Sequence, residues 1–144
     1  MKINCLGCGH KVDLAEVYDN YEGQVKCFAC SAILEIKTER MTDATKLENV
    51  RIELATLAKA RDAAIPRSAE LAELTDQLKS INEQLWDIED DIRDCERAKD
   101  FGEKFVELAR SAYKSNDRRS ALKRTINMLL GSRLVEEKSY RVYE

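Results

Sequence analysis

An unbroken apolar stripe in the middle of the chain is the feature that most restricts its fold. Eight residues follow one another in alternating steps of three and four: Leu71, Leu74, Leu78, Ile81, Leu85, Ile88, Ile92 and Cys95. This spacing places all of them on one side of an α-helix that packs against other helices. The stripe predicts a helix over residues 68–100, about 50 Å long at about 1.5 Å per residue, with Cys95 as a buried free thiol.

A second helix is expected over residues 42–64, where apolar residues also recur. Pro66 separates it from the stripe, and the apolar spacing changes phase there. We therefore expect a turn at residues 65–67 and a long antiparallel, coiled-coil-like hairpin. No glycine occurs between residues 24 and 101, which excludes a β-sandwich or barrel, since such folds need a turn about every 8–12 residues.

Two shorter helices are expected after the hairpin. Asp100 and Glu103 resemble the start of a capping box, and Ser115, Asn116 and Asp117 would end this helix and cap the next. Gly131 follows the last apolar residues as a suitable helix terminator. The predicted fold class is therefore mainly α.

Four of the five cysteines form two pairs with two residues between the members of each: Cys5 with Cys8, and Cys27 with Cys30. This spacing is typical of zinc bound by four thiolates, because a tight turn aims both sulfurs of a pair at one ion. Four thiolates leave no place for water, so the zinc is expected to be structural. The alternatives are iron in the same site, a redox dithiol, a disulfide framework, and His10 as a substitute ligand.

Strand-like segments surround the cysteine pairs at residues 11–13, 24–26 and 32–37. With the cysteines, they make residues 3–37 resemble a zinc ribbon with rubredoxin-like knuckles. We therefore divide the chain into a zinc ribbon, 1–40, and a helical domain, 41–144. The segment 13–22 is acidic and holds Tyr18 and Tyr21, so it is a candidate for protein contact and not for phosphate binding.

Charge is distributed unevenly along the chain, although its net value is only −3. Residues 42–92 hold 6 basic and 12 acidic side chains, and residues 93–144 hold 13 and 9. The basic excess is concentrated in one candidate anion-binding set: Arg110, Lys114, Arg118, Arg119, Lys123 and Arg124. Phosphate, a nucleic acid, an acidic protein patch or simple solvation of a helix face would each account for it.

Residues of about 80–143 resemble a small uncharacterised helical family of bacteria and phages. The resemblance lies in WDIEDDIR (86–93), LARS (108–111), NDRR (116–119), LKR (122–124), IN (126–127), LGS (130–132) and EEKSY (136–140). It implies no activity and no site residue.

The predicted function is that of a non-enzymatic adaptor, with the ribbon as a protein-contact head on an oligomerising helical stalk. A homodimer is the simplest assembly, although a tetramer is possible. Nucleic-acid or nucleotide binding through the basic set is the alternative. A metal-dependent nucleotide hydrolase comes third, because Glu70 with Glu73 and Asp87 with Asp90 loosely resemble a magnesium motif. Without an apolar run of membrane-spanning length or a leader, we expect a cytoplasmic protein.

Overall fold

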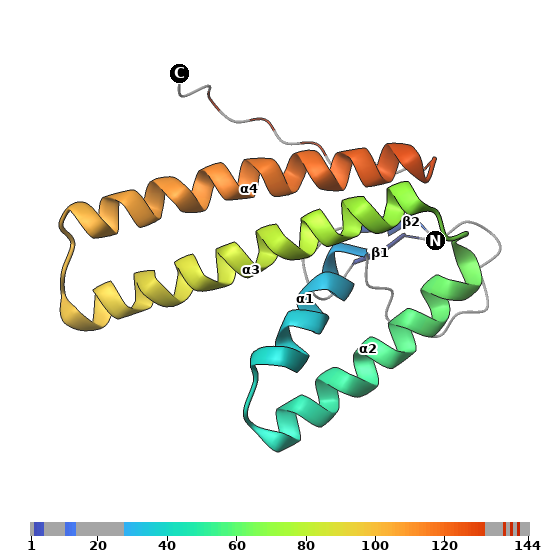
Figure 1. Ribbon diagram of the computed structural model, residues 1–144, viewed down its shortest axis with the longest axis horizontal. Helices are drawn as coiled ribbons and strands as arrows, with labels where there is room; N and C mark the ends of the chain where they lie inside the picture. The colour runs from blue at the N-terminus through green and yellow to red at the C-terminus, as the bar shows by residue number, and fades with distance from the viewer. Residues whose placement is uncertain are drawn as a thin grey trace. The chain divides into compact units, whose positions relative to one another are not determined.

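The computed structural model describes residues 2–4, 11–13, 28–131, 137, 139 and 141 (Figure 1). In chain order, the elements are two strands and four helices: β1 (Lys2–Asn4), β2 (Lys11–Asp13), α1 (Phe28–Arg40), α2 (Ala44–Ala64), α3 (Ala69–Ala98) and α4 (Glu103–Leu129). Two compact units divide the chain, Met1–Thr75 and Asp76–Glu144. The described part is mainly helical, as predicted, and none of its helices has the length and apolar content that a membrane span needs.

The two strands form an antiparallel pair. Ile3 pairs with Val12, and Asn4 with Lys11, so residues 5–10 connect paired strands. The strand predicted at residues 11–13 is confirmed. The strand predicted at residues 24–26 lies outside the described residues.

Helix α1 corrects the prediction of a strand over residues 32–37. Ala32, Leu34 and Ile36 are all buried, and so is Ser31. The alternation from residue 32 to residue 36 suggested a strand, but a helix surrounded on several sides also buries residues at such spacings. Its Glu, Lys, Leu and Ala residues favour a helix. Thr38 is accommodated by donating a hydrogen bond from its hydroxyl to the Glu35 carbonyl (2.6 Å).

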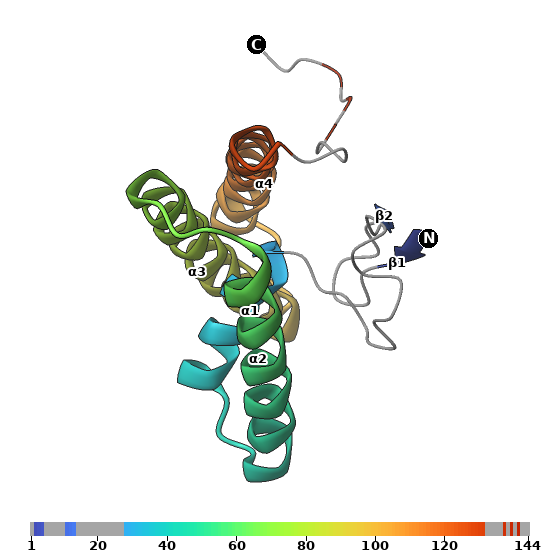
Figure 2. The ribbon, with the colours of Figure 1, turned by 90° about the vertical axis from the view of Figure 1, so that its right-hand side faces the viewer.

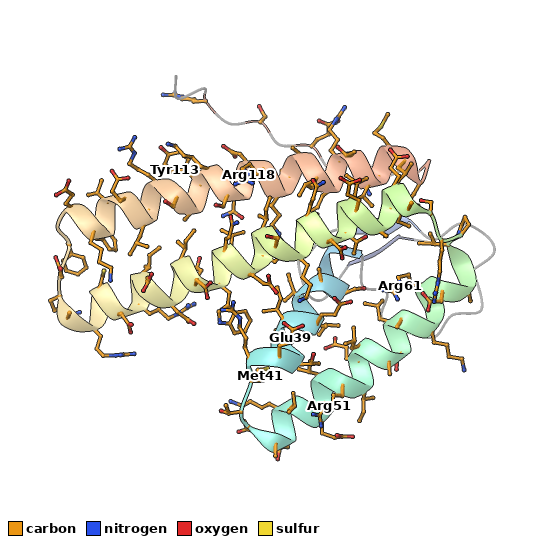
Figure 3. The ribbon with its side chains drawn as sticks, viewed as in Figure 1. Glu39, Met41, Arg51, Arg61, Tyr113 and Arg118 are labelled. Carbon is orange, nitrogen blue, oxygen red and sulfur yellow. The ribbon has the colours of Figure 1, made fainter. Side chains whose placement is uncertain are left out.

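Helix α2 packs against α1 in the first unit (Figure 2). Asp43 caps its N-terminus by accepting a hydrogen bond from the Lys46 amide (2.9 Å). The helix ends at Ala64, and α3 begins at Ala69, so the turn predicted around Pro66 is confirmed. This turn is braced by Asp62, which forms ion pairs with Arg61 (3.0 Å; Figure 3) and with Arg67 (3.1 Å). Their hydrogen bonds, that of Arg61 above all, hold the pKa of the Asp62 carboxyl below its usual value.

Helix α3 confirms the apolar stripe. Four of its members are buried: Leu71, Leu78, Ile81 and Cys95. The other four are half-buried: Leu74, Leu85, Ile88 and Ile92. Cys95 is a buried free thiol, as predicted.

Helix α4 is one continuous helix, so the prediction of two shorter helices is wrong. Ser115 is buried in its interior, and Asn116 and Asp117 continue the helical backbone. Serine, asparagine and aspartate each lower the stability of a helix interior by only about 0.7 kcal/mol or less relative to alanine. The packing of the helix segments on both sides against α3 outweighs this cost. Gly131 follows the C-terminus with a φ of 60°, a conformation that favours glycine, and this confirms its predicted role.

Within the first unit α2 packs against α1, and within the second unit α3 from Asp76 onward lies antiparallel to α4 (Figures 1 and 2). The predicted pairing of residues 42–64 with the long helix would join the two units, and it stays a prediction. Both helices line one open groove, through Ile81 of α3 and Leu122 of α4 among other residues. We call residues 76–129 the α3/α4 hairpin. The two compact units, Met1–Thr75 and Asp76–Glu144, do not show which parts of the chain fold independently. The division into domains 1–40 and 41–144 therefore stays a prediction.

Candidate functional site

The proposed zinc ligands adjoin described elements, but Cys5, Cys8 and Cys27 lie outside the described residues. Cys5 directly follows β1, and Cys27 directly precedes α1. The backbone of Cys30 lies in the first turn of α1. Candidate contact residues Tyr18 and Tyr21, and the alternative ligand His10, also lie outside the described residues.

The six basic residues of α4 do not form one face. Arg110, Lys114 and Arg118 follow each other at steps of four, which places them in one row along the helix. Arg119 belongs instead to the stripe that faces α3. Lys123 lies one turn beyond Arg119 on the same side of the helix, and Arg124 lies close in angle to Arg110 but about 21 Å further along, at about 100° and about 1.5 Å per residue.

Arg110 and Arg124 are engaged by acidic neighbours. Arg110 forms an ion pair with Glu107 (2.9 Å). A hydrogen bond with Tyr113, together with this ion pair, raises the pKa of the Arg110 guanidinium. Arg124 forms an ion pair with Glu137.

Arg118 and Arg119 do not begin a helix, contrary to the prediction, because α4 is continuous through them. No helix N-terminus supplies free amide donors there. Arg118 is exposed and lines the open groove, together with Ser80 and Gln77 of α3 and Thr125 of α4 (Figure 3). Within the described part of the chain, no carboxylate pairs with Arg118.

A second apolar stripe runs along α4 with the same steps of three and four as the stripe of α3. None of its members is exposed: Phe105, Leu108, Ala112, Ser115, Arg119, Leu122 and Ile126. The sequence already contains this spacing, but the expected break at residues 115–117 and the polar side chains of Ser115 and Arg119 concealed it. It identifies α4 as a partner for α3.

Two polar groups in the hairpin are buried without a hydrogen-bond partner. They are Nδ2 of Asn82 on α3 and Nε of Arg119 on α4. Residues equally distant from the turn lie at the same level in an antiparallel hairpin, so both groups belong to the level of Ile81. The hairpin therefore has a polar layer in the half away from its turn, about 28 Å from the turn at about 1.5 Å per residue.

The acidic pairs do not form a metal site in the described part of the chain. Glu70 and Glu73 lie near the start of α3, and Asp87 and Asp90 lie on the same helix, about 25 Å further along at 1.5 Å per residue. Among the described residues, no three His, Cys, Asp or Glu side chains gather closely enough to hold a metal ion.

The half of the hairpin that contains its turn is rich in incompletely buried apolar residues, which the predictions from the sequence did not include. Phe101, Val106 and Tyr113 are 51%, 50% and 41% exposed. Phe101 packs its ring edge-to-face against Phe105, with 5.3 Å between ring centroids. The sequence did contain a signal for this surface. Apolar residues occur at the turn and on the outer side of α4, although the segment around them is highly charged.

No protein-family model, curated protein or solved structure matches the chain. The resemblances to a zinc ribbon and to a helical family of bacteria and phages therefore remain expectations.

Proposed function

We propose that the chain is a non-enzymatic interaction protein, in which a zinc-bound N-terminal segment contacts a protein partner and the helical part self-associates. One observation carries this proposal. The α3/α4 hairpin is a single pair of helices whose apolar residues near the turn remain half-buried or exposed. Apolar surface of this kind marks interaction sites more often than free surface.

The zinc-bound segment is supported by the donor set and by its surroundings. Cys5, Cys8, Cys27 and Cys30 would hold Zn²⁺ as a closed shell of four thiolates, which supplies folding energy and no catalysis. The first pair lies in the connection between β1 and β2. The second pair includes Cys30 in the first turn of α1, where helix amides favour negative charge.

Metal analysis of the full chain tests the zinc site. Protein purified without added metal should contain about one zinc per chain, and the Cys27→Ser variant should lose it. Cys95→Ser is the matched control, because it removes a cysteine outside the two pairs and should keep the metal. Iron, or four free thiols without metal, would contradict the proposal. A protein partner captured by the wild type and lost by Cys27→Ser would assign the contact to the zinc-bound segment.

Anion binding by α4 is the second candidate function, and one observation favours it. Arg118 lines the open groove beside the hydroxyl-bearing residues Ser80 and Thr125, and no described carboxylate neutralises it. A guanidinium beside hydroxyl donors suits a phosphate group. Arg110 lies in the same row but is paired with Glu107, and Arg119 belongs to the inward stripe, so this candidate depends on Arg118 and its neighbour Lys114.

A further inference from the structure

In the second unit, as far as the structure describes it, the apolar residues in the half of the α3/α4 hairpin near its turn are only partly covered. Leu85, Ile88 and Ile92 on α3 and Leu108 on α4 are only half-buried, although they belong to the two inward stripes. Trp86, the only tryptophan of the chain, is half-buried beside them. A pair of helices buries only the side chains along the contact between them. Further helices must pack on the pair to remove these side chains from water.

The hairpin is also polarised in charge along its length. Its distal half, residues 87–113 around the turn, holds nine acidic and five basic residues, for a net charge of −4. Its proximal half, residues 76–86 and 114–129, holds three acidic and six basic residues, for a net charge of +3. At about 1.5 Å per residue, the distal half is about 20 Å long, and the proximal half is about 17 Å long on α3 and about 24 Å long on α4.

We propose that a second copy of this chain covers the α3/α4 hairpin, with the two turns pointing in opposite directions. This inference rests on the self-association in the proposed function and specifies its geometry. The distal half of each hairpin then lies on the proximal half of the other, and a twofold axis crosses both at the level of Ile88 and Ala112. The product is an antiparallel four-helix bundle that buries the half-exposed residues of both copies.

The charge distribution favours this orientation, and it favours a second copy of the chain as the partner. With the turns at opposite ends, net negative distal halves meet net positive proximal halves twice. With the turns at the same end, negative halves would face each other, as would positive halves, and such juxtaposition is costly. Because the chain supplies both complementary charges on surfaces of similar length, a second copy satisfies both halves at once.

The geometry specifies which charges approach each other across the interface. Asp91 lies about 14 Å from the turn, and Lys114 lies about 21 Å from it, which together equal the hairpin length of about 36 Å. Asp91 therefore reaches the level of Lys114 of the second copy. By the same reasoning, Asp94 reaches the level of Arg118. All four side chains are exposed in the single chain, so their replacement leaves its packing intact.

Charge reversal in two separate variants tests the proposal. The acid-reversed variant has Asp91→Lys and Asp94→Lys, and the base-reversed variant has Lys114→Glu and Arg118→Glu. Each should dimerise at least about tenfold more weakly than the wild type, because the reversed side chains meet side chains of the same sign across the interface. Mixed together, they should form a heterodimer near wild-type affinity, since the reversed side chains of one variant then meet oppositely charged, reversed side chains of the other. Sedimentation measures the dissociation constants, and Trp86 fluorescence should shift to the blue on association.

The control reverses two exposed basic residues of α2, Lys46→Glu and Arg51→Glu, and should leave the dissociation constant unchanged. Tighter dimers of the acid-reversed variant alone would show that the turns lie at the same end and would overturn the proposal. Dimers indifferent to all four reversals would overturn this geometry and leave self-association standing. A wild type that stays monomeric would overturn the geometry and self-association together, while zinc content would still decide the zinc site.

Discussion

Leu78 and Asn82 are buried one helical turn apart on α3. Burial of the Leu78 side chain stabilises the folded protein, whereas burial of the Asn82 amide destabilises it. Leu78→Ala should lower the free energy of unfolding by about 2–5 kcal/mol, because it opens a cavity at a fully buried position. Asn82→Ala should change it by less than about 1 kcal/mol. The packing lost there is offset by removal of an Nδ2 group that is buried without a partner, which costs about 1–3 kcal/mol. Urea unfolding followed by circular dichroism measures both.

Gln84→Ala is the control for these two variants, because Gln84 is exposed on the same helix and should stay within about 0.5 kcal/mol of the wild type. A loss for Asn82→Ala as large as that for Leu78→Ala would show that the Asn82 amide is fully hydrogen-bonded in solution.

At the scale of the element, packing keeps α4 helical through residues 115–117, although their side chains favour a helix end. Proline substitutions can test whether the helix is continuous there. Asn116→Pro should lower stability by about 3 kcal/mol or more, because proline removes a hydrogen bond in the middle of a continuous helix and clashes with the preceding turn. Glu103→Pro should be tolerated, since it is the first helical residue and follows the extended Gly102. Thermal unfolding compares the two variants. Equal tolerance at both positions would indicate that the chain breaks at residues 115–117 after all.

At the scale of the whole molecule, the net charge of −3 argues against general binding of nucleic acids, and a titration with salt can separate the two candidate functions. If α4 binds phosphates through Lys114 and Arg118, duplex oligonucleotides should bind at low salt. Their affinity should then fall by roughly 0.9 log unit per log unit of salt for each phosphate contacted. Fluorescence anisotropy measures this, and Arg118→Ala should reduce both the affinity and the slope. If the chain is the interaction protein that we propose, we expect no such binding even at low salt.

Features that depend on residues close together in the chain were predictable from the sequence. The stripe of α3 is confirmed because its spacing matches the helical repeat without interruption, and all eight members are buried or half-buried. The turn at Pro66, the strand at residues 11–13 and the role of Gly131 are confirmed for similar local reasons. The four-cysteine zinc site, Tyr18 and Tyr21 lie outside the described residues and remain predictions, as does any ligand of the basic set.

The sequence by itself determined where helices can form and which of their sides are apolar, whereas the tertiary structure decided which apolar sides meet. Residues 32–37 have a spacing that suits both a strand and an enclosed helix, and only packing in the first unit resolved it. Ser115 and Arg119 look like the end of one helix and the start of another until α3 is placed opposite them. The physical reason is that local preferences differ by only tenths of a kcal/mol to about 1 kcal/mol per residue, whereas burial of a large apolar side chain contributes about 1.5–3 kcal/mol and depends on a partner distant in the sequence.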